Sequence, residues 1–185
     1  MRDLEGEHVY DDLGLFVLRV VVGGIVLAHG LMKIGWPMST GQRGLPAVRG
    51  VAGFFGNLGF SPPMFWALVA IVAEIGGSLL MILGLGGPIG PGLVFGDMVI
   101  VTYVVHWPAG FWAGGGKQIS GWEFPLPLTA GALALTLIGN GSWSLDALLN
   151  LTYPDWLTPA WVGLMILGDV ALLAIRSSRK APAAK

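Results

Sequence analysis

LGLFVLRVVVGGIVLAHGLM, residues Leu13 to Met32, is the stretch that decides the fold of this chain. Its 20 apolar-rich residues match the ~30 Å that a helix needs to cross the hydrocarbon core of a bilayer. The stretch also contains Arg19 and, near its end, His29. A guanidinium without a partner is costly in hydrocarbon, so we expect an acidic residue on a neighbouring helix to pair with Arg19.

The composition of the whole chain indicates a membrane protein. Of its 185 residues, 54% are hydrophobic and only 11% are charged, and the mean hydropathy is +0.73. A net charge of −1 gives no reason to expect nucleic-acid binding. Because the chain has no cysteine, it has no disulfide, no thiolate metal site and no Cys-ligated iron–sulfur cluster.

Long apolar runs predict five membrane-spanning helices. We expect them at residues 13–33, 64–85, 90–106, 124–138 and 158–175, between a polar tail at 1–12 and a basic tail at 177–185. Residues 46–60 mix apolar side chains with Arg49 and Asn57, a pattern typical of an amphipathic helix at the interface. The tight run GLGGPIGPG favours an antiparallel hairpin of the second and third spans, and Ser144 is expected to cap a short surface helix.

The basic residues predict the orientation of these spans. If the N-terminus is outside, the outside segments hold only Arg2, and the inside segments hold Lys33, Arg43, Arg49, Lys117, Arg176, Arg179, Lys180 and Lys185. Positive residues favour the cytoplasmic side, so the N-terminus is expected outside and the C-terminus in the cytoplasm. An interfacial last helix instead of a spanning one would weaken this bias.

Three carboxyls lie inside the predicted spans, at Glu74, Asp97 and Asp169. Counting the helical rise from the ends of the spans places Arg19 and Asp97 in the outer half and Glu74 near the midplane. The sequence therefore predicts a buried polar centre of Arg19, Glu74 and Asp97. A structural ion pair between Arg19 and Glu74 that fixes helix register is one interpretation. A polar pocket or proton path is the other, because the remaining acids have no second arginine.

The last span and the loop before it are expected to face a partner. This span is peripheral in the predicted bundle, so Asp169 is assigned to a subunit interface together with Trp156 and Trp161. The contacts of this surface would be with other membrane or soluble subunits, in addition to the lipid bilayer.

Four residues near the inner ends of their spans are candidates for ligand binding: His29, Lys33, His106 and Trp107. They could simply belong to the interfacial belt. They also suit a quinone head group, because histidine donates to a carbonyl while an aromatic ring stacks on the quinone. The two histidines could ligate a b-type haem, but nothing beyond the pair supports it. No catalytic residue, metal site or covalently bound cofactor is predicted.

A set of short motifs runs in order through the first four spans. They are Arg19, HGLMK at 29–33, AEIGG at 73–77, His106, GWE at 121–123 and GNGSWSLD at 139–146. In order and spacing they resemble the DoxX family of small bacterial membrane proteins, over roughly residues 13–149. The characteristic positions of that family would fall on Arg19, His29, Lys33, Glu74, His106, Glu123 and Asp146.

This resemblance implies a four-helix membrane bundle related to a subunit of thiosulfate:quinone oxidoreductase and to other membrane redox complexes. The fifth span, within residues 150–176, goes beyond that core. We therefore expect an all-α integral membrane protein of the bacterial cytoplasmic membrane. Its expected function is that of a subunit of a quinone-linked oxidoreductase complex, which contacts quinone or anchors a redox partner. A noncatalytic structural subunit is the alternative, and a small transporter or lipid-binding bundle ranks third because no inverted repeat is visible.

Overall fold

The computed structural model describes residues 2–37, 41–114 and 120–179, and all regular structure in these residues is helical. The α-helices are α1 (Arg2–Lys33), α2 (Leu45–Asn57), α3 (Pro63–Val72), α4 (Ser78–Leu83), α5 (Ile89–Ile100), α6 (Pro125–Ile138), α7 (Leu145–Leu148) and α8 (Leu157–Arg179). Two π-helical segments, η1 (Ala73–Gly77) and η2 (Val101–His106), and the 3₁₀ turn η3 (Trp107–Ala109) continue α3 and α5.

Within the described residues, four helical stretches are long and apolar enough to cross a membrane: Val9–Lys33, Pro63–Leu83, Ile89–Ala109 and Leu157–Ser178. Together they establish an all-α, multi-pass membrane bundle, as the sequence predicted. The predicted fourth span corresponds to α6, which is apolar but has only 14 residues. The helix of the first span begins earlier than expected, because residues 2–12 continue α1 instead of forming a tail.

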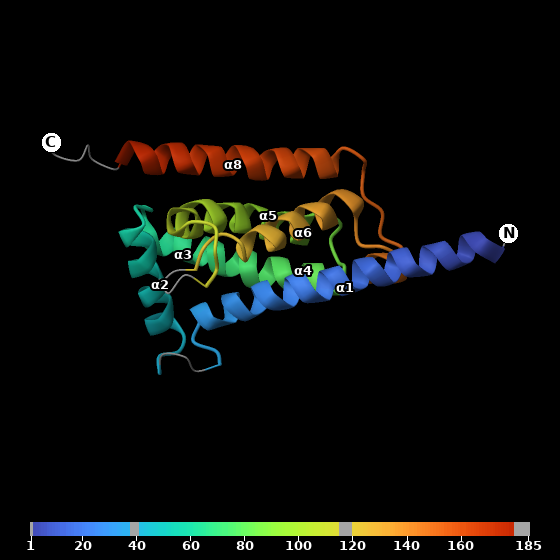
Figure 1. Cartoon of the computed structure of the whole chain (residues 1–185), viewed down its shortest axis with the longest axis horizontal. Helices are drawn as coiled ribbons and strands as arrows, with labels where there is room; N and C mark the ends of the chain where they lie inside the picture. The colour runs from blue at the N-terminus through green and yellow to red at the C-terminus, as the bar shows by residue number, and fades with distance from the viewer. Residues whose placement is uncertain (1, 38–40, 115–119, 180–185) are drawn as a thin grey trace.

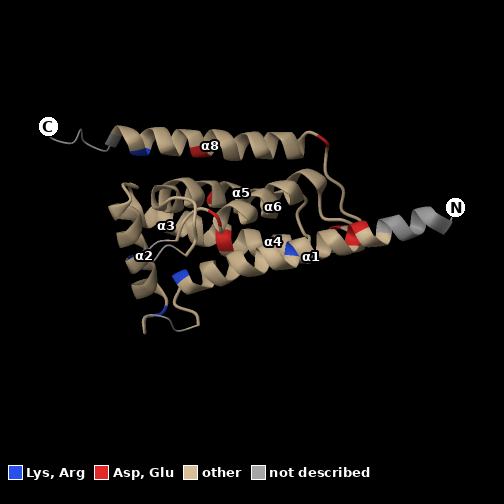
Figure 2. Cartoon of the chain, viewed as in Figure 1, with Lys and Arg blue, Asp and Glu red and all other residues tan. Residues whose placement is uncertain are grey.

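The helices stand side by side, with α1, α3–α4, α5 and α6 forming the core of the bundle (Figure 1). Helix α8 lies along one side of this core, and none of its apolar window is buried. Helix α2 lies across the end of the bundle where α1 finishes, which confirms the predicted amphipathic helix. Charged residues are sparse along the bundle (Figure 2), as a lipid environment requires.

Small residues let the core helices approach closely. The hydrophobic core contains Val26, Met81, Val94 and Leu135, which come from four different helices and are at most 1% exposed. Where α5 crosses the helix before it, a Cβ on Gly90 would lie 2.6 Å from the Cβ of Leu80, a distance that no real side chain tolerates. Glycine at this crossing therefore sets the close antiparallel packing of the hairpin.

Arg19 is fully buried, but its partners are backbone carbonyls and not a carboxyl. The guanidinium donates to the carbonyl of Trp143 and, at 3.4 Å, to that of Ile82, and it lies 5.7 Å from the ring centroid of Phe16. The Ile82 carbonyl belongs to the last turn of α4, where the helix dipole is negative. The end of a helix thus contributes compensation together with the negative charges of Asp12 and Asp146, neither of which the sequence analysis had proposed as a partner of Arg19.

The predicted pairing of Arg19 with Glu74 or Asp97 is wrong for a geometric reason. Glu74 lies level with Gly30 of α1, since a Cβ on Gly30 would be 2.9 Å from the Cβ of Glu74. Arg19 is 11 residues earlier in the same helix, which is about 16 Å along the axis. An arginine side chain does not span that separation.

A buried aspartate, Asp146, organises the loops beside Arg19. It accepts hydrogen bonds from the backbone N–H groups of Gly86 (2.9 Å) and Gly87 (2.8 Å), from Asn140 Nδ2 (2.7 Å) and from the Tyr153 hydroxyl (2.8 Å). Burial raises the pKa of Asp146, but the two backbone donors, Tyr153 and Asn140 together bring this pKa below its usual value. Ser144 caps α7 as predicted, because its hydroxyl accepts from the N–H of Ala147 at 3.2 Å.

The lowered pKa of Asp146 predicts that this end of the bundle loses stability in acid. A carboxyl whose folded pKa lies below its unfolded pKa stabilises the fold above the unfolded value, and this contribution disappears as pH falls through the folded value. The loss should begin below about pH 5. We expect the difference in free energy of unfolding between wild type and Asp146→Asn, measured in detergent, to shrink between pH 7 and pH 3. A difference that stays constant over that range would contradict the assignment.

Candidate functional site

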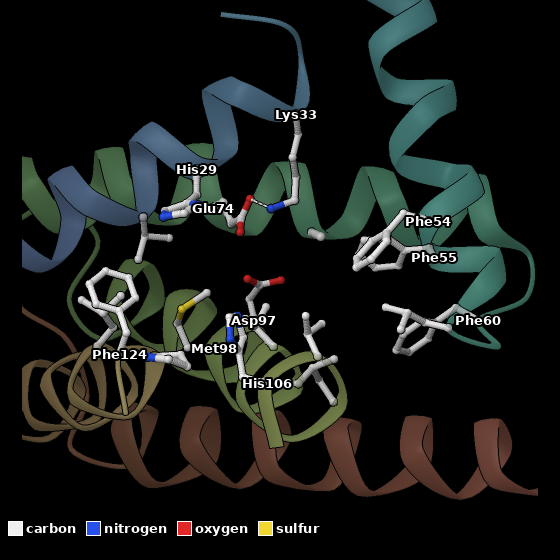
Figure 3. A pocket seen from close by; sticks show the side chains of 18 residues that line it. His29, Lys33, Phe54, Phe55, Phe60, Glu74, Asp97, Met98, His106 and Phe124 are labelled. Carbon is white, nitrogen blue, oxygen red and sulfur yellow. Dashed lines mark hydrogen bonds and ion pairs between the residues drawn. The ribbon is translucent and has the colours of Figure 1, made fainter. Parts of the chain in front are cut away.

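A cavity of about 240 Å³ lies between the helices at the end of the bundle where α1 meets α2. Its walls come from α1, α2, η1, α5, η2 and the start of α6. Most of the lining is apolar, but five polar side chains border the cavity (Figure 3): His29, Lys33, Glu74, Asp97 and His106. This combination of an apolar wall and a few convergent polar groups is typical of small-molecule sites.

Two of these polar residues belong to π-helical segments. Glu74 lies in η1, and His106 is the last residue of η2. A π segment interrupts the regular α-helical hydrogen bonding and is found frequently at functional sites. Sequence periodicity predicted continuous helices here, because one extra residue in a turn leaves the apolar pattern nearly unchanged.

Lys33 and Glu74 form an ion pair between the end of α1 and η1. The Lys33 ammonium donates to Oε2 of Glu74 (Figure 3); Glu74 is 2% exposed, whereas Lys33 is 22% exposed. The basic partner of Glu74 is therefore Lys33, a residue that the sequence analysis had placed in a different group. Because a buried ion pair rarely adds stability over apolar packing, we interpret it as part of a polar site.

Asp97 faces Glu74 across the same cavity (Figure 3). Its Oδ2 atom is buried and has no hydrogen-bond partner among the described residues. Of the predicted polar centre, Glu74 and Asp97 thus lie together, whereas Arg19 lies at the other end of the bundle.

The two histidines approach the cavity from α1 and η2 (Figure 3). His106 Nδ1 lies 2.7 Å from the carbonyl oxygen of Ser120. A carbonyl can only accept, so Nδ1 must be the donor, and this bond fixes the orientation of the imidazole. The remaining ring nitrogen of His106 is then available to a ligand.

The aromatic wall of the cavity differs from the predicted one. Trp107 stacks on Trp122, with ring centroids 5.1 Å apart, and it is not one of the described lining residues. The aromatic side chains that do line the cavity are Phe54, Phe55, Phe60 and Phe124. Phe54 and Phe55 belong to the amphipathic pattern of residues 46–60, which the sequence analysis identified. That pattern did not show that α2 forms one wall of a cavity.

The residues assigned to a subunit interface have different environments. Asp169 does not point away from the bundle, because its Oδ2 is buried and the residue lines a second cavity with Asp97. Trp161 donates its indole N–H to the carbonyl of Ile89 at 3.2 Å, so it joins α8 to α5 within the chain. Both residues thus make contacts within the chain, and their assignment to a subunit interface stays a prediction. Trp156 is 66% exposed at the start of α8, and its role at an interface stays a prediction.

Comparison with curated proteins and with solved structures finds no match. The family model of DoxX matches residues 14–107, just over half of the chain, and this range includes all five polar residues of the cavity. The motifs at 121–123 and 139–146, and helix α8, lie outside the matched range. The chain is a member of the DoxX family.

Proposed function

We propose that this protein is the membrane subunit of a redox complex and that its cavity holds the head group of a quinone. The observation that supports the proposal is the grouping of Lys33, Glu74, Asp97 and two histidines around one phenylalanine-lined cavity. A quinone ring has two carbonyls that accept hydrogen bonds and two flat faces that stack on aromatic side chains. The residues on the cavity wall match both requirements.

The polar residues also suit the chemistry of quinone reduction. Conversion of a quinone to a hydroquinone takes up two electrons and two protons. Lys33 and the histidines can donate hydrogen bonds to the carbonyls, and the carboxyls of Glu74 and Asp97 can relay protons to them. The electrons would come from a redox centre on a partner subunit.

The basic residues support a cytoplasmic location for this end of the bundle. Among the described side chains, Lys33, Arg43 and Arg49 belong to α1, α2 and their connection, and Arg176 bonds to the segment after α2. We therefore propose that the cavity lies near the cytoplasmic face of the bacterial inner membrane, with the N-terminus outside and the C-terminus inside.

Quinone binding to the purified protein tests the proposal. In lipid nanodiscs, we expect wild type to bind a benzoquinone and Glu74→Gln to bind it about tenfold more weakly, because the variant loses the charge that positions Lys33. Glu123→Gln is the matched control. Glu123 accepts a hydrogen bond from Ala113 at 2.9 Å and, within the described part of the chain, stands apart from the cavity lining.

Two results would argue against a quinone site. The first is a wild-type protein that binds no quinone, and the second is equal affinity in wild type and Glu74→Gln. A complex that co-purifies in fixed stoichiometry and keeps its activity with Glu74→Gln would instead support a noncatalytic structural subunit.

A further inference from the structure

A second cavity, of about 270 Å³, separates the middle of α8 from the core of the bundle. Its walls come from α3, η1, α5 and α8, with contributions from Phe55 and Phe60. Apart from Asp97 and Asp169, and the indole of Trp66, the described lining is aliphatic, aromatic or glycine. A space with these walls suits hydrocarbon better than a polar ligand.

The second cavity adjoins the first. Five residues line both cavities: Phe55, Phe60, Ala70, Asp97 and Ile100. Asp97 therefore stands where the polar cavity meets the apolar one. A single molecule with a polar head and an apolar tail could occupy both spaces.

Helix α8 contacts the bundle near both of its ends and, through Met165, which packs against the core beside Gly96 of α5, at one point between them. Near one end of α8, Trp161 donates to the carbonyl of Ile89 at 3.2 Å. Near the other, Arg176 Nε donates to the carbonyl of Leu58 at 2.7 Å, and its guanidinium lies 5.7 Å from the ring centroid of Phe60. Between these contacts Gly168 lines the cavity, and a Cβ built on it would have no neighbour within 4 Å. The cavity is the space that these contacts leave open between α8 and the bundle.

We infer that the second cavity receives the hydrocarbon tail of the molecule whose head group occupies the first. The tail would pass Asp97 and leave between α3 and α8 into the bilayer. This inference rests on the proposed quinone site and adds to it the entry route and the class of ligand, a quinone with a long alkyl or isoprenoid chain. No residue in the apolar window of α8 is fully buried, so we expect a bilayer-dissolved ligand to reach the cavity from the side of this helix.

The test compares a tail-less quinone with its long-tailed homologue. The probes are 2,3-dimethoxy-5-methyl-1,4-benzoquinone and the same ring with a decyl chain at position 6, bound to the full chain in nanodiscs. Free concentrations are referred to the aqueous phase, with empty nanodiscs as the blank for partition into lipid. On this scale each methylene moved out of water contributes about fourfold in affinity, so wild type should prefer the decyl homologue by at least about tenfold. In Gly168→Phe, which adds a ring to the lining of this cavity, this preference should disappear, while affinity for the tail-less ring stays within about twofold.

A matched control lies on the same helix. A Cβ on Gly163 also has no neighbour within 4 Å, and Gly163 is not among the described residues that line either cavity. Gly163→Phe should therefore leave the affinity for both probes unchanged. Equal losses in the two phenylalanine variants would overturn the inference, because they would reflect a general effect on α8.

The outcomes separate the inference from the proposed function. If wild type binds neither probe, the quinone site itself is wrong. If it binds both and Gly168→Phe keeps the preference for the decyl homologue, only the tail placement is wrong.

Asp169 provides an independent check, because a hydrocarbon tail has no use for its carboxyl. Asp169→Leu should bind the decyl homologue at least as tightly as wild type. A loss of more than about threefold would overturn the tail placement and favour a polar path through this cavity.

Discussion

Replacement of Asp146 by alanine is expected to lower the free energy of unfolding by about 4 kcal/mol. The carboxylate accepts from two backbone N–H groups, an amide and a phenol, at distances of 2.7 to 2.9 Å. Alanine would leave these donors without their acceptor in a site where Asp146 itself is only 6% exposed. Each unsatisfied buried donor costs about 1–3 kcal/mol, although water entering the site would recover part of the total.

Unfolding in mixed detergent micelles, followed by circular dichroism, measures this effect. Asp155→Ala is the control, since Asp155 is an exposed aspartate of the neighbouring loop and its replacement should change stability by no more than about 0.5 kcal/mol. A loss of less than about 1 kcal/mol for Asp146→Ala would show that the network contributes little to holding the loops together.

Gly84→Ala is expected to destabilise the protein by about 3 kcal/mol. Gly84 follows α4 with φ +64°, a left-handed conformation in which a side chain is strained. A Cβ there would also lie 2.0 Å from Arg19 Nη1 and 2.5 Å from the Cβ of Ser144. The guanidinium would have to move away from the carbonyls that compensate its charge.

Gly86→Ala separates the strain from the steric contact. Gly86 also has a positive φ, +88°, but a Cβ on it would meet nothing within 4 Å. The free energy of unfolding of Gly86→Ala should therefore fall only by the cost of backbone strain, about 1–2 kcal/mol. The same unfolding assay applies to both variants, and equal losses would mean that the buried guanidinium can move aside at no cost.

The two ends of the bundle have different roles in this interpretation. At the Arg19 end, the network of Asp146 closes the loops between helices, although Arg19 Nε and Asn140 Oδ1 have no hydrogen-bond partner among the described residues. At the Lys33 end, an ion pair and an unpaired carboxyl oxygen border an open cavity.

Much of the architecture could be predicted from residue order alone. Apolar runs of membrane length located the helices, since only a helix satisfies its own backbone hydrogen bonds in lipid. The mixed pattern of residues 46–60 predicted α2, and Ser144 predicted the cap of α7. These features are local, so neighbouring residues along the chain were sufficient to determine them.

The partners of the buried charges were decided only by the tertiary structure. Counting residues from the ends of the spans assumed upright helices with equal starting levels, but the packing of Gly30 against Glu74 sets a different register. Charge counting also overlooked the carbonyls at the end of α4, which carry no formal charge and yet compensate Arg19. Pairing across helices depends on tilt, register and helix ends, and these follow from the packing of the whole bundle.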